Sequence, residues 1–326
     1  MDGVSVPNVS HPSIAVSGDS IVATQELSAP RAARSATEAK VDYHHPQRGV
    51  KWGPIVRHAV LIFFCAAVLL PLFWIFLLSL KSFPDAVRSY IWPHNFIHPL
   101  FTHYEYSWKQ IPTLRTNFMN SVVVTLGTIL FATVASVLGG YALVILETPA
   151  KKVVISILVA SLFFPTRVTA LIGIFQVQDK LGLINNTWGL ILPYTALSVA
   201  ISTFIMRGVF ETVPKEIVHS AHIDGASSMR TLLEIVLPLV RNGIVVVIIV
   251  NFVAAWGEYL LALTLMNDQS HRTLPVVIVQ AGGGMGAWKW PRLASVYVMA
   301  IIPGLAAFGI SQRWYMKGLQ EGAMKA

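Results

Sequence analysis

The ionisable side chains that could take part in chemistry are few and lie far apart along the chain. Charged residues make up only 12% of the 326 residues. Glu258 and Arg167 each stand within or beside an apolar run, where a charge is costly and usually faces a cavity or a partner. Glu258 either lines such a cavity or hydrogen-bonds to a neighbouring helix. For Arg167, which follows Pro165, we favour a side chain that extends to a polar boundary over one that lines a cavity.

The histidines could in principle bind metal. His94, His98 and His103 stand near Glu105, but Pro99 between them prevents a common helical face, so we interpret them as exposed loop histidines. His219 and His222 are three residues apart on one helical face, a spacing that suits contacts with another protein better than a metal ion. We therefore predict no metal site.

No motif for covalent or nucleotide chemistry is present. The sequence contains no G-x-x-x-x-G-K-[ST] phosphate-binding loop, no nucleophile–base arrangement and a single cysteine, Cys65. We expect a chain that is not an enzyme and that binds no ATP or other cofactor itself.

The elements that carry these residues must lie in lipid. The composition is 54% hydrophobic with a mean hydropathy of +0.61, whereas a soluble domain has about 25% charged residues. Too few charges remain to coat a globular surface, which indicates an integral membrane protein. The formal net charge is +8, but the basic residues form no patch that would bind nucleic acid.

Six apolar runs approach the roughly 20 residues that cross a bilayer as a helix. They lie near 55–79, 118–146, 153–175, 189–206, 242–266 and 292–310. The sequence lacks the recurring ten-residue alternation of a membrane β-barrel, so we predict an all-α membrane protein with six transmembrane helices. Residues 1–50 have no sustained period and are predicted to be a disordered tail, which leaves 51–326 as the membrane domain.

The basic residues predict the orientation. Of the 24 Lys and Arg residues, 15 fall on the side that holds both termini, which we therefore place in the cytoplasm. The outward connections are then 80–117, 176–188, which looks like a short interfacial helix, and the Gly-rich 267–291. The longest cytoplasmic connection is 207–241.

The 207–241 loop has the signals of two short helices. Pro214 suits a helix start, and a helix over 215–223 would end at Asp224-Gly225, with Gly225 in the left-handed conformation. Ser227 or Ser228 can cap a second helix, which Pro238 would end. Ile217, Ala221 and Ile223 are expected to supply an apolar patch.

Three segments resemble one known family. "PKEIVHSAHIDGASSMRTLLEIVLPLV" resembles the cytoplasmic loop of the binding-protein-dependent ABC importer permeases, and "WGEYLLALTLMNDQSHRTLPV" resembles the fifth helix of their carbohydrate-uptake branch. The ending "IIPGLAAFGISQRWYMKGLQEGAMKA" is similar to that of the maltose-type second permease. The resemblance implies a type I ABC importer permease fold with a cytoplasmic coupling helix between helices 4 and 5.

The resemblance also implies roles for particular residues. The residues that would couple to the ATPase are Glu216, His219, Ser220, Ala221, His222, Asp224, Gly225 and Ala226. The candidate residues of a translocation pathway are Glu258, Tyr259, Trp256 and Arg167. His219 replaces the acidic residue usual in the family, and Gly257-Glu258-Tyr259 stands where the family usually has Asn-Glu-Phe.

The function implied is that of a permease subunit of an ATP-driven importer for a sugar, an oligosaccharide or a related carbohydrate, in the bacterial inner membrane. The implied partners are a second permease subunit, two ATPase subunits that hold ATP and Mg²⁺ and dock on 207–241, and an extracytoplasmic solute-binding protein on the outward loops. The alternative is a self-sufficient secondary transporter, but the internal repeats common in that class are not seen.

Overall fold

The computed structural model describes residues 52–87, 92, 100–146, 149–163, 170–283 and 290–323. The predicted tail and the residues Arg167, His94 and His98 lie outside these ranges. Contacts divide the chain into two units, Met1–Val56 and Arg57–Ala326, and the following description concerns the second unit.

The regular elements of the described residues are helices, as the all-α prediction requires. In chain order they are α1 (Trp52–Leu80), α2 (Phe83–Val87), α3 (Thr102–Gln110), α4 (Leu114–Val144), α5 (Lys151–Phe163), α7 (Leu171–Lys180), α8 (Trp188–Phe210), α9 (Lys215–Ile223), α10 (Ser228–Arg230), η1 (Thr231–Val236), α11 (Leu237–Leu239), α12 (Arg241–Trp256), α13 (Leu260–Leu265), α14 (Leu274–Gly283) and α15 (Trp290–Ala323).

Four of the described helices are long and apolar enough to cross a membrane. They are Val56–Leu80, Leu114–Val144, Trp188–Phe210 and Trp290–Gln312, and they match the first, second, fourth and sixth predicted spans. A fifth span results if Ser228–Leu239 and Arg241–Trp256, which meet at 83°, count as one. The predicted third span corresponds to α5 and α7, between which 164–169 lie outside the described residues.

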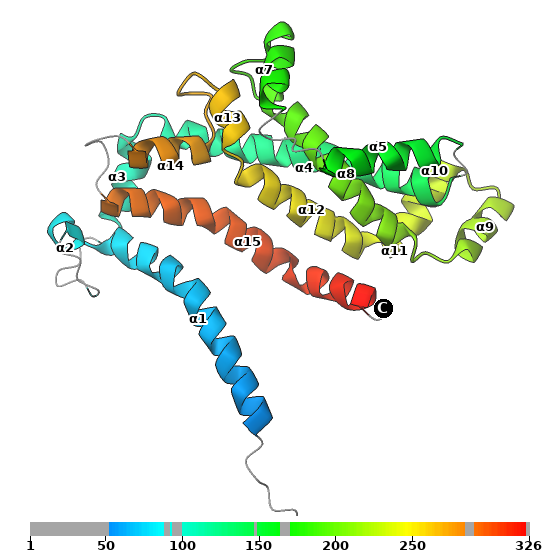
Figure 1. The fold of residues 1–326 in the computed structure, drawn as a ribbon, viewed down its shortest axis with the longest axis horizontal. Coiled ribbons are helices and arrows are strands. Elements are labelled where there is room, and N and C mark those ends of the chain that lie inside the picture. The colour runs from blue at the N-terminus through cyan, green and yellow to red at the C-terminus, as the bar shows by residue number, and fades with distance from the viewer. Residues whose placement is uncertain are drawn as a thin grey trace, which may run out of the picture. The chain divides into compact units, whose positions relative to one another are not determined.

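The core is formed where α4 packs along α8 and α12, and α12 packs along α15 (Figure 1). Small residues allow this close approach. A Cβ atom added to Gly140 of α4 would lie 2.9 Å from the Cβ of Met206 and 3.1 Å from the backbone N of Arg207, both on α8. Polar residues also pair across the core, because the hydroxyl of Ser202 on α8 donates to the Oδ1 of Asn251 on α12 at 3.0 Å.

Helix α1 is the least buried of the four described helices that are long enough to cross a membrane. Only 6% of its most apolar window is buried, and its buried residues Leu77, Ser79 and Leu80 lie at its C-terminal end. Exposed apolar side chains such as Phe63, which is 68% exposed, must be covered by lipid or by another protein.

The predicted interfacial helix over 176–188 is wrong in its bounds. Helix α7 covers Leu171–Lys180 and is followed by a turn. In that turn Gly182 has φ 65° and Asn185 has φ 57°, a left-handed conformation that ends a helix.

Candidate functional site

The predicted helix at the start of the 207–241 loop is present as α9, over Lys215–Ile223. Pro214 precedes it in extended conformation. Glu216 lies in the first turn, where a negative charge stabilises the helix through its interaction with the helix dipole. Val218 and Ala221 are buried, 7% and 5% exposed, and face the core. Of the residues predicted to supply an apolar patch, Ala221 is buried, Ile217 is half-buried and Ile223 is 74% exposed.

The turn after α9 is a two-hydrogen-bond C-terminal cap of the Schellman type. Gly225 has φ 80°, as predicted. Its N–H donates to the carbonyl of His222 at 3.1 Å, and the N–H of Ala226 donates to the carbonyl of Ala221 at 2.9 Å. These bonds fix the direction of the chain as it leaves α9.

The second predicted helix is also present, but Pro238 does not end it. The hydroxyl of Ser227 accepts the N–H of Arg230 at 3.4 Å and caps α10, and the chain continues as the π-helix η1. In η1 the N–H of Leu237 donates to the carbonyl of Leu232. Pro238 lies in α11, the last turn of the same continuous helix, and the bend comes after Leu239.

The 207–241 loop is fastened to the membrane helices. Tyr141 of α4, which is 4% exposed, donates its hydroxyl to the carbonyl of Ser228 at 3.0 Å. Leu232 and Val236 of η1 are buried in a cluster with Val218 of α9 and Met206 of α8. The loop is therefore in direct contact with both α4 and α8.

The predicted coupling residues occupy two environments. Glu216, His219, Ser220, His222, Asp224 and Gly225 are exposed, Ala226 is half-buried and Ala221 is buried. The exposed residues lie along α9 and in the turn that follows it. Ala221 instead holds α9 against the core, so its side chain lies below the surface that a partner could contact.

The second group of predicted residues surrounds a break in the fifth predicted span. Helix α12 ends at Trp256, and α13 begins at Leu260. Glu258 is 8% exposed, and its carboxylate accepts the N–H groups of Leu261 at 3.0 Å and Ala262 at 3.1 Å. Such a carboxylate caps a helix N-terminus, and its negative charge interacts favourably with the positive end of the helix dipole.

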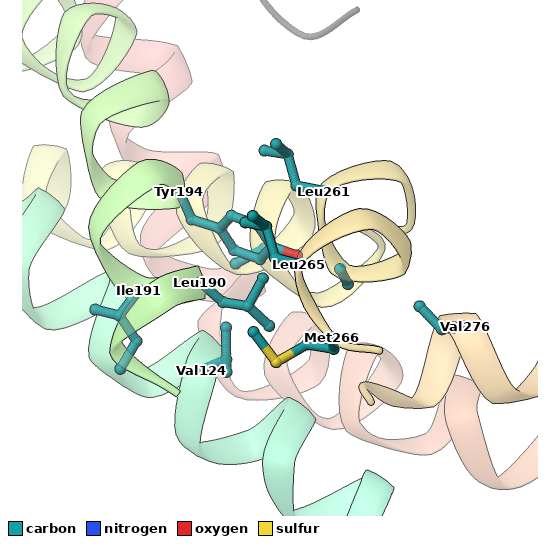
Figure 2. Close-up of a cluster of buried hydrophobic side chains, with 10 residues drawn as sticks. Val124, Leu190, Ile191, Tyr194, Leu261, Leu265, Met266 and Val276 are labelled. Carbon is teal, nitrogen blue, oxygen red and sulfur yellow. The ribbon is translucent and has the colours of Figure 1, made fainter. Parts of the chain in front are cut away.

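The hydroxyl of Tyr194 on α8 donates a third hydrogen bond to Glu258, at 2.5 Å. Figure 2 shows Tyr194 within the cluster in which side chains of α8 meet those of α13, among them Leu261 and Leu265. Of the two interpretations left open for Glu258, the structure shows the hydrogen bond to a neighbouring helix, and the residue also lines a small pocket with Tyr194 and Ser198. Sequence reasoning missed Tyr194, although a tyrosine in an apolar span signals a buried polar contact.

The remaining predicted pathway residues lie on either side of this break. Trp256 donates its ring N–H to the carbonyl of Ala300 on α15 at 3.1 Å and stacks on Phe252. Tyr259 is half-buried and packs against the same cluster as Tyr194. Arg167 lies outside the described residues.

The end of the unit opposite α9 is organised around the turn between α13 and α14. The side chains of Asn117 and Asn120, at the start of α4, donate to backbone carbonyls of this turn at 2.7–3.1 Å. The Oδ1 of Asn185 accepts the N–H groups of Asn267 and Asp268. The turn is therefore held rigidly from two other segments.

His103 is not an exposed loop histidine, contrary to the prediction. It is 2% exposed on α3, and its Nε2 donates to the carbonyl of Lys81 at 3.0 Å. Burial lowers the pKa of His103, the bond to Lys81 opposes this, and nearby Arg292 lowers the pKa further. The periodic pattern gave no sign of this burial, because α3 buries its residues against the distant α15.

Comparison with known proteins gives a consistent result. The family model described as binding-protein-dependent transport system inner membrane component matches residues 135–320. The sulfoquinovosyl glycerol transport system permease protein of Agrobacterium fabrum is 34% identical over 270 residues, which cover 81% of this chain and 93% of that protein. The diacetylchitobiose uptake system permease protein of Streptomyces coelicolor is 27% identical over 272 residues, 83% of this chain and 88% of that protein.

Among solved structures, the fold is similar to that of a bacterial ABC transporter involved in the import of the acidic polysaccharide alginate. The TM-score is 0.71 at 20% identity, and the match covers 80% of this chain and 96% of that chain. At this identity the likeness concerns the fold alone. With a family model that spans α9, the Gly225 turn and the Glu258 break, the chain belongs to the binding-protein-dependent transport system inner membrane components.

Proposed function

We propose that the chain is the permease subunit of an ATP-driven ABC importer for a carbohydrate or a carbohydrate-like solute. The family match over 135–320 carries this proposal. The choice of solute class is supported by the relatives, which are named for sulfoquinovosyl glycerol, diacetylchitobiose and sn-glycerol-3-phosphate transport.

The proposed architecture has six membrane spans and both termini in the cytoplasm of a bacterium, with residues 1–50 as a tail and 51–326 as the permease domain. Four apolar helices and the bent α10–α12 segment support it. The remaining span would run through 153–175. A second permease subunit is proposed as the partner that, with lipid, covers the exposed apolar surface of α1.

Coupling is proposed to run through the 207–241 loop. The two ATPase subunits would hold ATP and Mg²⁺, and one of them would contact the exposed residues of α9 and of the Gly225 turn. A displaced α9 would move η1, which is packed against it, and then α4 through the Tyr141–Ser228 hydrogen bond. A short helix with a fixed cap can act as a rigid lever, because its turn does not bend freely.

The translocation pathway is proposed to pass the break between α12 and α13, where Trp256, Glu258 and Tyr259 lie, with Arg167 as a further candidate. The Glu258 carboxylate already accepts three hydrogen bonds, so we assign it the role of shaping the wall of the pathway. The rigid turn between α13 and α14 is exposed and would face the solute-binding protein.

Reconstitution tests the function. The purified chain alone should hydrolyse no ATP, and hydrolysis stimulated by the loaded binding protein should appear when the ATPase and second permease are added. Hydrolysis by the isolated chain at a comparable rate would contradict the proposal.

Labelling of single cysteines tests the orientation. In a Cys65→Ala background, an impermeant thiol reagent added to intact cells should label Asp268→Cys and not Ser228→Cys. Labelling of Ser228→Cys alone would show that the orientation in the membrane is the opposite of the one proposed.

A further inference from the structure

A cavity of about 1240 Å³ lies between α9 on one side and the end of α4 and the start of α5 on the other. One wall is formed by Val144, Ile145 and Leu146 at the end of α4 and by Lys151 at the start of α5. The opposite wall is α9, and we name the space the α4–α9 cavity. Ligand pockets for small molecules usually have volumes of about 300–1,000 Å³, so this cavity has room for part of a protein.

The floor and the rim of the α4–α9 cavity differ in polarity. Phe210, Val213 and Val218 line it and belong to the buried cluster that includes Met206 and Leu232. An apolar floor within a polar rim is the arrangement of a protein-binding pocket that accepts an anchoring side chain.

The rim of the cavity is continuous with the surface that is proposed to meet the ATPase. Lys215, His219 and His222 line the cavity, and their spacing of four and three residues places them on one face of α9. His219 and His222 are also predicted coupling residues. The exposed Ile223 lies at the end of the same helix. A protein that contacts these residues therefore lies over the mouth of the cavity.

We propose that the ATPase subunit inserts an apolar side chain, carried on a polar segment, into the α4–α9 cavity. This inference rests on the proposed function and adds a second contact to it. The subunit then docks between two walls, the end of α4 and α9, and does not depend on α9 alone. A displacement of the inserted segment acts directly on α4, without passing through η1.

Site-specific photo-crosslinking in the full complex tests the two contacts separately. A photoreactive amino acid would replace Lys151 on the wall opposite α9, or Ile223 at the end of α9. Leu181, which follows α7, would be replaced as the control. Leu181 is 61% exposed and lies in the predicted outward loop, so it should give no ATPase adduct. We expect adducts with the ATPase from both Lys151 and Ile223.

The outcomes distinguish this inference from the proposed function. An ATPase adduct from Ile223 without one from Lys151 would leave the function standing and overturn the second contact. Adducts from neither position would overturn both. An adduct between Lys151 and this chain's own terminal segments would show that the chain itself fills the cavity, and would also overturn the inference.

A matched pair of variants adds a functional readout. Leu146→Asp places a charge in the cavity wall, whereas Ala150→Asp places the same charge at an exposed position outside the lining. Leu146→Asp should lower co-purification of the ATPase at least about tenfold while expression and pairing with the second permease persist. Equal co-purification in both variants would contradict the inserted side chain.

Discussion

Replacement of Gly225 by valine should abolish most of the coupled uptake while the permease still folds. Gly225 has φ 80°, and an added Cβ would meet nothing within 4 Å. The change therefore introduces no clash. Its whole effect comes from forcing a β-branched residue into the left-handed region.

The structure allows the size of this effect to be worked out. A left-handed conformation costs an L-residue about 1–2 kcal/mol. At the upper end this lowers the population of the native turn roughly 30-fold relative to turns with negative φ. Burial of Val218, which holds α9 on the core, stabilises the helix by about 1.5–3 kcal/mol. The two effects are comparable, so we expect α9 to stay packed while its end and the turn shift.

The assay compares coupled uptake and ATPase co-purification among three variants in one membrane preparation. Gly225→Val should lower uptake about tenfold or more. Gly225→Asn should retain most of it, because asparagine adopts the left-handed region more readily than other non-glycine residues. Gly208→Val, on α8 before the loop, adds the same side chain where nothing lies within 4 Å and φ is not positive, and it should have little effect.

Normal coupled uptake by Gly225→Val would refute the reasoning, since the 207–241 loop would then be a connector whose direction does not matter. Equal loss in Gly225→Asn would refute the conformational explanation and would point instead to the loss of glycine's small size.

Three further predictions concern the helical core and the buried His103 of α3. Tyr194→Phe should destabilise the solubilised complex by about 1.5–3 kcal/mol in thermal unfolding, and Glu258→Ala should cost more, because it leaves the α13 N–H groups without their acceptor. Gly140→Ala should destabilise by about 1–3 kcal/mol, whereas Gly139→Ala, whose Cβ would be 3.4 Å from Thr203, should be tolerated; equal thermal stability of the two would contradict the close α4–α8 approach. Because the pKa of His103 is lowered on folding, the unfolded chain binds its proton more readily, and the free energy of unfolding should fall as the pH drops below about 6.5. His103→Gln should remove that part of the pH dependence between about pH 7.5 and pH 5.5, and an unchanged slope would exclude His103 as its source.

The local structure of the 207–241 loop could be predicted from sequence because neighbouring residues decide it. A proline before residue 215, an Asp-Gly pair at 224–225 and a serine at 227 are sufficient to predict a helix, a left-handed turn and a new helix start. The membrane location followed from composition in the same way, since a chain with 12% charged residues cannot coat itself with polar groups.

The contacts that join these elements could not be predicted, because their partners are far apart in the chain. Tyr141 and Ser228 are 87 residues apart, and Tyr194 and Glu258 are 64 residues apart. A hydrophobic pattern shows that a residue lies in an apolar span but not which residue of another helix it will meet. Pro238 was misjudged as a helix end, since the helix continues through η1 and α11 to Leu239 before it bends. The sequence by itself determined the membrane location, the α9 helix and its glycine turn, whereas helix packing alone decided which side chains fasten that turn to the core and where Glu258 finds its donors.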